Sequence, residues 1–220
     1  FRHTAGYDAV ISEYMTELAG EENPESLTMT FDLIQTLRYG ENPHQQASFY
    51  KKPLGSAFSI AYAEQLHGKE LSYNNINDAD AALQIVKEFK EPAAVAVKHM
   101  NPCGVGTGDT IAVAFKKAFD ADSTSIFGGI IALNREVDLE TASMLKDIFL
   151  EIIIAPSFTQ EAFEILSVKK NIRLLTVSFD SGVKDERKFT SVQGGLLVQD
   201  RDTYGFEEAT ITVPTKRQPT

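Results

Sequence analysis

The feature that most constrains the fold is a regular alternation of amphipathic and apolar segments that begins near residue 77. Short apolar runs of strand length follow segments whose apolar residues recur at helical spacing. A chain that alternates in this way builds an α/β domain, with helices packed against a sheet. The expected helices cover residues 77–89, 110–119, 139–149 and 160–168, and the expected strands cover 93–98, 126–133, 152–155, 173–179, 191–199 and 209–213.

The residues before this alternation divide into a helix and a linker. Apolar residues recur at helical spacing from Thr4 to Leu18, with Thr4 itself a suitable N-cap and Gly20 near the helix end. The acidic segment that follows contains Pro24, which is typical of a linker. We therefore expect residues 1–25 to stand apart from a domain of residues 26–220.

Composition and charge disfavour several classes of protein. The chain has 220 residues with 14 Gly and 8 Pro, and 24% of its residues are charged, which is an ordinary globular mixture. Its formal net charge of −10 disfavours a nucleic-acid partner. Its apolar stretches fall far short of the roughly 18 residues that a membrane helix needs. One cysteine, Cys103, supplies neither an internal disulfide nor a cysteine-rich zinc site. We expect a protein of the cytosol without a membrane partner.

Two candidate catalytic residues, Lys98 and His99, come at the end of the apolar run 93–98. They precede Asn101 to Gly104, which is typical of a turn, so both are expected at the carboxyl end of a strand, where open α/β sheets bind ligands. A histidine is readily tuned as a base near neutral pH, and an adjacent ammonium can stabilise an oxyanion. The pair suits acyl transfer to a weak nucleophile. A solvated lysine beside an ordinary turn histidine explains the same pattern.

Further candidates for ligand binding lie in polar turns. Arg38 can bind a phosphate through two hydrogen bonds and Tyr39 can pack on a planar ring, unless both simply face solvent. The glycines between 104 and 108 resemble a phosphate loop weakly, and a flexible turn before the next helix explains them as well. The amides within 72–78 exceed what helix capping by Asn77 requires, so the others could bind a ligand.

Two more candidates accompany the later strands. Gly128 and Gly129 are expected inside the strand 126–133, where glycine marks a bulge, a close backbone approach or a packing requirement. Glu151 directly precedes the strand 152–155, where its carboxylate could bind ribose hydroxyls or face water.

Five motifs occur in one order along most of the chain. They are Leu37-Arg38-Tyr39-Gly40-Glu41-Asn42-Pro43-His44-Gln45, Gly68-Lys69-Glu70-Leu71-Ser72-Tyr73-Asn74-Asn75, Val97-Lys98-His99-Met100-Asn101-Pro102-Cys103-Gly104, Phe127-Gly128-Gly129 and Ile153-Ile154-Ala155-Pro156. Together they resemble the formyltransferase domain of the bifunctional enzymes that act as aminoimidazolecarboxamide ribonucleotide (AICAR) formyltransferase and IMP cyclohydrolase. The ordered set is far more specific than any single motif, and it favours the functional interpretation of each.

The resemblance implies a cytidine deaminase-like three-layer α/β/α domain preceded by a linker helix. Residues 1–25 are similar to the last helix of the family's cyclohydrolase domain, and residues 26–220 are similar to the first half of its formyltransferase domain. A second copy of the fold, with most folate contacts, is then expected after Thr220, and the cyclohydrolase residues are expected before Phe1. The longer protein is expected to be a homodimer. The deaminase zinc ligands have no counterpart in this sequence, so the resemblance implies no metal-activated water.

The resemblance also implies a reaction, in which 10-formyltetrahydrofolate gives its formyl group to the exocyclic amine of AICAR during IMP biosynthesis. His99 is implied to take the amine proton, while Lys98 stabilises the oxyanion or protonates the leaving folate nitrogen. The residues implied to bind the nucleotide are Arg38, Tyr39, Asn75, Gly128 and Glu151. At Glu151 the family often has Asp followed by Gly. Two alternatives are a noncatalytic nucleotide-binding or assembly half-domain and an unrelated deaminase-like hydrolase, which the absent zinc ligands disfavour.

Overall fold

The computed structural model describes residues 1–179, 187–202 and 212–217, which belong to two compact units, Phe1–Gly182 and Val183–Thr220. The helices among the described residues are α1 (Arg2–Ala19), α2 (Tyr73–Val86), α3 (Ile111–Ala121), α4 (Leu139–Leu145) and α5 (Gln160–Ser167), with a single 3-10 turn, η1 (Ile60–Tyr62). The strands of the first unit are β1 (Asp32–Leu37), β2 (Ala47–Lys51), β3 (Glu64–His67), β4 (Ala93–Lys98), β5 (Asn101–Thr107), β6 (Ile130–Leu133), β7 (Ile152–Ala155) and β8 (Arg173–Thr176). The second unit contains β9 (Lys188–Val192) and β10 (Gly195–Gln199), which pair antiparallel.

The main sheet of the first unit is mixed, with the strand order β3-β8-β7-β6-β4-β5. Strands β6, β7 and β8 are parallel to one another. Strand β4 runs antiparallel to both of its neighbours, β5 and β6, and β3 runs antiparallel to β8. Every residue of β6 and β7 is buried, as expected for strands covered on both faces.

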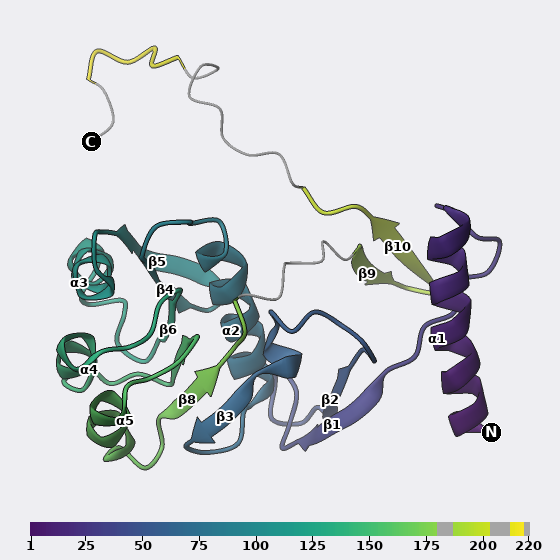
Figure 1. Cartoon of the computed structure of the whole chain (residues 1–220), viewed down its shortest axis with the longest axis horizontal. Helices are drawn as coiled ribbons and strands as arrows, with labels where there is room; N and C mark the ends of the chain where they lie inside the picture. Colours follow the sequence, from purple (N-terminus) through teal and green to yellow (C-terminus); the bar gives the residue numbers. More distant parts are fainter. Residues whose placement is uncertain (180–186, 203–211, 218–220) are drawn as a thin grey trace. The chain divides into compact units, whose positions relative to one another are not determined.

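Helices cover both faces of this sheet (Figure 1). On one face, Phe115 of α3, Leu145 of α4 and Leu166 of α5 share an apolar core with residues of the sheet. On the other face, Leu83 of α2 and Leu37 of β1 belong to a second core. The first unit is therefore a three-layer α/β/α domain, as predicted. Its likeness to the cytidine deaminase fold stays a prediction.

Each helix and strand predicted between residues 77 and 179 has a counterpart in the structure, several with other bounds, whereas β5 was not predicted. The strands predicted at 93–98 and 152–155 have those bounds in β4 and β7. The strand predicted at 126–133 is reduced to β6, and the helix predicted at 139–149 ends earlier, in α4. The hairpin of β9 and β10 confirms β structure near residues 191–199. Of the strand predicted at 209–213, residues 209–211 lie outside the described residues, and 212–213 are not in a strand.

The position predicted for Gly128 and Gly129 is wrong, because both precede β6 rather than lie inside it. Residues 123–128 form turns. The Asp122 carboxylate accepts hydrogen bonds from the Ser125 backbone N–H at 2.8 Å and from the Ser125 hydroxyl at 2.5 Å. Gly128 then adopts a φ of 75°, in the left-handed region that favours glycine.

The turn predicted at Asn101 to Gly104 is also wrong, because these residues begin β5. The chain instead reverses at His99 and Met100, which have φ values of 53° and 64°. The tight turn between β4 and β5 therefore consists of two non-glycine residues.

The glycines of β5 serve packing. A Cβ placed on Gly104 would lie 2.0 Å from the carbonyl oxygen of Ala118, and one on Gly106 would lie 2.3 Å from that of Ala114. Both carbonyls belong to α3, so the two glycines permit a close approach of this helix to β5. Residues 101–107 are therefore a strand, rather than the phosphate loop or the flexible turn considered for the glycines between 104 and 108, and Gly108 follows that strand.

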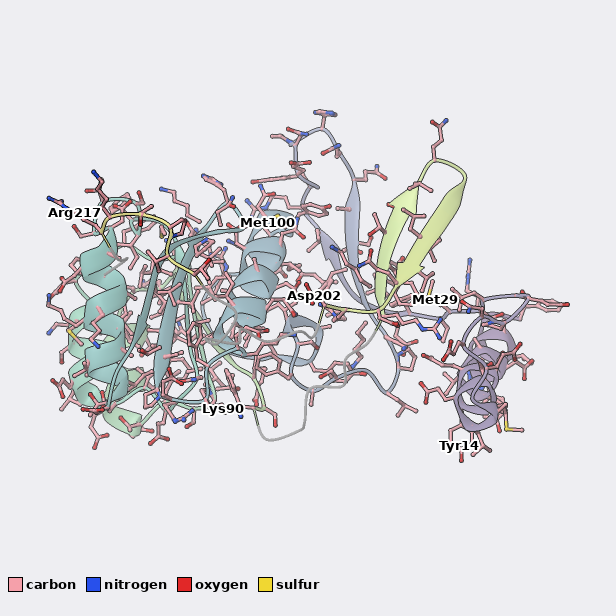
Figure 2. All side chains as sticks on the ribbon, turned by 90° about the horizontal axis from the view of Figure 1, so that it is seen from above. Tyr14, Met29, Lys90, Met100, Asp202 and Arg217 are labelled. Atoms are coloured by element: carbon pink, nitrogen blue, oxygen red, sulfur yellow. The ribbon has the colours of Figure 1, made fainter. Side chains whose placement is uncertain are left out.

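The first helix is present and ends at Gly20, which has a φ of 66°. It begins before Thr4, with Phe1 as its N-cap, so the predicted cap at Thr4 is wrong. Ala9 is its one buried residue. Tyr14 is 62% exposed and is labelled on this helix in Figure 2. Among the described residues, no helix combines the length and apolarity needed to cross a membrane.

Candidate functional site

The candidate site lies at the edge of the sheet where β4 ends with Lys98. Because β4 is antiparallel to β6, Val97 pairs with Ile130 at the beginning of β6, and Ile130 pairs with Ile152 at the beginning of β7. Lys98 and His99 are thus at the carboxyl end of their own strand but at the amino ends of the parallel strands. The prediction that both lie at the carboxyl end of their strand is confirmed, but this edge is not the carboxyl edge of the parallel strands, because β4 is antiparallel to β6.

The structure brings Lys98 to the turn that contains Gly128. The Lys98 ammonium donates a hydrogen bond to the carbonyl oxygen of Phe127 at 2.8 Å. The next residue, Gly128, donates its N–H to the Phe149 carbonyl at 2.7 Å, and the rings of Phe127 and Phe149 have centroids 5.1 Å apart. The Lys98 side chain is therefore anchored beside a turn that is itself fixed.

Glu151 lies at the same edge, because its N–H donates to the Gly129 carbonyl at 3.0 Å. Its carboxylate forms an ion pair with Arg173, with Oε2 2.7 Å from Nη1. Arg173 is only 8% exposed, and its Nε donates to the carbonyl oxygens of Lys69 and Glu70, both at 3.1 Å. The sequence predicted that the Glu151 carboxylate binds ribose hydroxyls or faces water, and neither prediction included this ion pair.

Arg173 was not among the residues singled out from the sequence. It joins three segments, the start of β8, the residue before β7 and the loop that leads to α2. The sequence does contain a signal for Arg173, because an arginine that begins an otherwise buried strand needs partners for its charge.

Asn75 contributes to the start of α2. The helix begins after Ser72, whose hydroxyl accepts from the Asn75 N–H, while the Asn75 carbonyl Oδ1 accepts from the Ser72 N–H, both at 3.2 Å. The predicted cap at Asn77 is therefore wrong, because Asn77 lies within the helix. The Asn75 side-chain NH₂ has no hydrogen-bond partner in the described part of the chain. It is free to donate to a ligand.

The turn between β4 and β5 is tied to α2. The Met100 N–H donates to the Asp78 carboxylate at 2.8 Å, and the Asn101 amide donates to the His99 carbonyl at 2.8 Å. His99 itself is exposed. Figure 2 shows Met100 and Lys90 at opposite ends of the layered domain. The start of α2 and the candidate catalytic residues are therefore at one edge.

Arg38 and Tyr39 follow β1, which runs beside the beginning of α2. The Gln35 side chain donates to the Leu71 carbonyl at 3.2 Å, one residue before the cap of α2. Arg38 is exposed, and its guanidinium has no hydrogen-bond or ion-pair partner among the described residues. In that same part of the chain, no hydrogen bond or ion pair joins Arg38 or Tyr39 to Lys98.

The nearby thiol and the acidic groups do not form another reactive centre. Burial raises the pKa of the Cys103 thiol above its ordinary value, and the thiol contacts the Ala96 carbonyl at 3.5 Å. Cys103 is therefore poorly suited to be a nucleophile. Across the described ranges, no group of three or more His, Cys, Asp or Glu residues could hold a metal ion.

The complete sequence, residues 1–220, matches the family described as AICARFT/IMPCHase bienzyme. The chain belongs to this family. The chain is 71% identical over 220 residues to the bifunctional purine biosynthesis protein PurH of Halalkalibacterium halodurans. The corresponding proteins of Anoxybacillus flavithermus and Bacillus subtilis are 70% and 68% identical. Each match covers all of this chain and 43% of the relative, so the chain spans less than half the length of these curated relatives.

Membership of the AICARFT/IMPCHase bienzyme family confirms the resemblance that the five motifs indicated. The relatives are named as bifunctional proteins of purine biosynthesis.

Proposed function

We propose that this chain forms the first half of an AICAR formyltransferase domain in a longer bifunctional enzyme. The observation that carries the proposal is the position of Lys98 and His99 at the edge where Gly128, Glu151 and the beginning of α2 also lie. A general base and a cation beside ligand-binding groups suit acyl transfer to a weak nucleophile.

The proposed reaction moves a formyl group from 10-formyltetrahydrofolate to the exocyclic amine of AICAR. The amine nitrogen attacks the formyl carbon, and a tetrahedral intermediate with an oxyanion forms. His99 accepts the proton that the amine loses. The bond between the formyl carbon and the folate nitrogen then breaks, and that nitrogen receives a proton as tetrahydrofolate leaves. The products are formylated AICAR and tetrahydrofolate.

Lys98 is suited to stabilise the oxyanion. An ammonium has three N–H donors, and the contact with the Phe127 carbonyl uses one of them. The remaining donors can bind the oxyanion or protonate the leaving nitrogen. Because the contact fixes the ammonium before substrate binds, little reorganisation is needed during the reaction.

The nucleotide is proposed to bind along the same edge. Arg38 holds its phosphate through charge-assisted hydrogen bonds, and Tyr39 packs on its ring system. The Asn75 NH₂ and the backbone at Gly128 orient the base. Glu151 uses Oε2 for Arg173, which leaves Oε1 to accept a hydrogen bond from a ribose hydroxyl.

The rest of the longer protein is part of the proposal. A second copy of the fold supplies most folate contacts, a separate domain carries the IMP cyclohydrolase activity, and the active protein is a homodimer of the cytosol. We propose no metal in the formyl transfer, and neither a nucleic-acid nor a membrane partner.

The second candidate is a nucleotide-binding or assembly half-domain that has no turnover of its own. It is favoured by the share of the relatives that this chain covers, 43%. Both candidates share the nucleotide site, so nucleotide binding tests that site and turnover distinguishes the candidates.

The first experiment is a calorimetric titration of this chain with AICAR. We expect binding that Arg38→Ala weakens at least about tenfold through the loss of phosphate contacts. Arg2→Ala, which removes an exposed arginine of α1, is the matched control and should leave the affinity unchanged. Failure of a folded chain to bind AICAR, or equal effects of the two substitutions, would contradict the site proposed here.

Turnover is measured in the full-length protein and in this chain with 10-formyltetrahydrofolate as donor. We expect formylated AICAR from the full-length protein. Product formed by this chain alone would exclude the half-domain without turnover.

A further inference from the structure

The turn between β4 and β5 has an unfavourable backbone conformation at the proposed catalytic base. A two-residue hairpin turn of this kind needs a positive φ at both central residues, and Asn-Gly is the preferred pair there. Here the pair is His99 and Met100, with φ values of 53° and 64°. Residues with a Cβ rarely adopt this region, and they keep it only where the surrounding structure holds them there.

Besides the backbone pairing of β4 with β5, two side-chain hydrogen bonds hold this turn. The Asn101 side chain donates to the His99 carbonyl at 2.8 Å, which is a contact within the hairpin itself. The Asp78 carboxylate accepts from the Met100 N–H at 2.8 Å and comes from a residue 22 positions away. Asp78 belongs to α2, which packs on the sheet through buried residues such as Leu83. The second hydrogen bond therefore ties the turn to a rigid element.

We propose that Asp78 is a positioning residue for His99. By accepting the Met100 N–H, its carboxylate fixes the left-handed turn and so the direction in which the His99 imidazole meets the amine of the substrate. The inference rests on the proposed function, in which His99 removes the amine proton. Asp78 contacts no reacting atom in this account, so it affects the rate through geometry alone.

The test compares steady-state kinetics of variants in the full-length protein. Asp78→Ala removes the acceptor, and we expect kcat to fall about tenfold because His99 is misplaced, while the KM for AICAR changes less than about twofold. Asp80→Ala is the matched control, because its carboxylate accepts from Gln84 on the same helix. We expect Asp80→Ala to keep the wild-type kcat.

Two rescue variants separate positioning from a general loss of structure. Asp78→Asn keeps an oxygen that can accept the same N–H, so its kcat should stay within about threefold of wild type. Met100→Gly lets the turn adopt a positive φ without the tie to α2. When Met100→Gly is added to Asp78→Ala, it should therefore recover at least about half of the decrease in the logarithm of kcat.

The outcomes distinguish this inference from the proposed function. If His99→Ala leaves kcat unchanged, the proposed function is wrong and the role of Asp78 is wrong with it. If His99→Ala lowers kcat and Asp78→Ala does not, only the positioning role is overturned. It is also overturned if neither Asp78→Asn nor the added Met100→Gly gives activity above that of Asp78→Ala. Should Asp78→Ala fail to fold, a low kcat of Asp78→Asn overturns the inference and a near-normal one supports it.

Discussion

Lys98 and His99 are neighbours in sequence but are held in different ways. The Lys98 ammonium is bound to the Phe127 carbonyl, whereas the His99 side chain is exposed on a turn whose backbone is held by Asp78 and Asn101. The two candidate catalytic groups can therefore be perturbed independently, the first through its own contact and the second through the turn.

We expect Lys98→Ala and His99→Ala each to lower turnover of the full-length protein at least about a hundredfold, because each removes a group that acts in the transition state. Initial rates of formyl transfer at saturating substrate measure this. Lys90→Ala, an exposed lysine at the opposite end of the domain (Figure 2), should leave the rate unchanged. Losses much below a hundredfold would assign Lys98 and His99 to substrate binding instead.

We expect the Asp122 carboxylate to make the stability of the chain depend on pH. Hydrogen bonds from Ser125, chiefly from its hydroxyl, lower the pKa of this carboxyl below 3.8. A carboxyl with a lowered pKa in the folded state contributes stability above its ordinary pKa and loses that contribution as the pH falls through the folded value. Asp122→Ala should therefore lower the urea midpoint near neutral pH, and the difference from wild type should shrink below pH 3.8.

The control for this experiment is Asp109→Ala, which removes an exposed aspartate that precedes α3, whereas Asp122 directly follows that helix. Its urea midpoint should follow that of the wild type at every pH. A difference between Asp122→Ala and wild type that stays constant from neutral to acidic pH would contradict the proposed contribution.

At the scale of elements, the close packing of β5 on α3 depends on glycine. Because a Cβ on Gly104 would meet the Ala118 carbonyl at 2.0 Å, Gly104→Ala should push the helix away and destabilise the chain by about 1–3 kcal/mol. Urea unfolding followed by circular dichroism measures the change. Gly6→Ala, where the nearest atom is a side-chain hydroxyl of Thr30 at 3.3 Å, should be neutral or stabilising because it lies in α1. Equal midpoints for the Gly104 variant and the wild type would contradict this account.

The sequence predicted those helices and strands whose apolar pattern can be recognised within their own residues. The strands β4 and β7 are continuous apolar runs, and the helices between them have a clear apolar face, so their pattern alone revealed them. Strand β5 was missed because glycines and Pro102 disfavour strands, and the reason for Gly104 is a contact with a helix that follows later in the chain. The reversal of β4 was missed because His99 and Met100 lack the Asn-Gly signal of a hairpin turn.

The residues of the candidate site also divide into those that the sequence pattern could reveal and those that only the fold reveals. Lys98, Gly128 and Glu151 could be singled out because each adjoins a recognisable strand. Asp78 could not be singled out, because a carboxylate within a helix is expected to face solvent until the turn that it binds is known. Arg173 left a partial signal, a charge beside buried positions, but its three partner segments are brought together only by the fold.

At the scale of the whole chain, the first helix contributes little to the buried core. Tyr14 and Met15 are 62% and 55% exposed, whereas Leu83 of α2 is 1% exposed. We expect Tyr14→Ser and Met15→Ser each to change the free energy of unfolding by less than about 0.5 kcal/mol. Leu83→Ala should cost about 2–5 kcal/mol. Urea midpoints of the three variants test this, and a large loss at Tyr14 would show that α1 is packed in solution.

The joining of β3 to β8 has a consequence for the order of folding. His67 contacts the Ile172 carbonyl 105 residues later, and Arg173 reaches back 104 residues to the Lys69 carbonyl. Contacts of such long range form slowly, because closing a long loop costs conformational entropy before the contact can stabilise the chain. During synthesis, Gln35 can contact the loop that leads to α2 early, but the hydrogen bonds from Arg173 to this loop cannot form until Arg173 has left the ribosome. Because Glu151 of the proposed nucleotide site pairs with Arg173, we expect this site to be completed late, although many of its residues are made first.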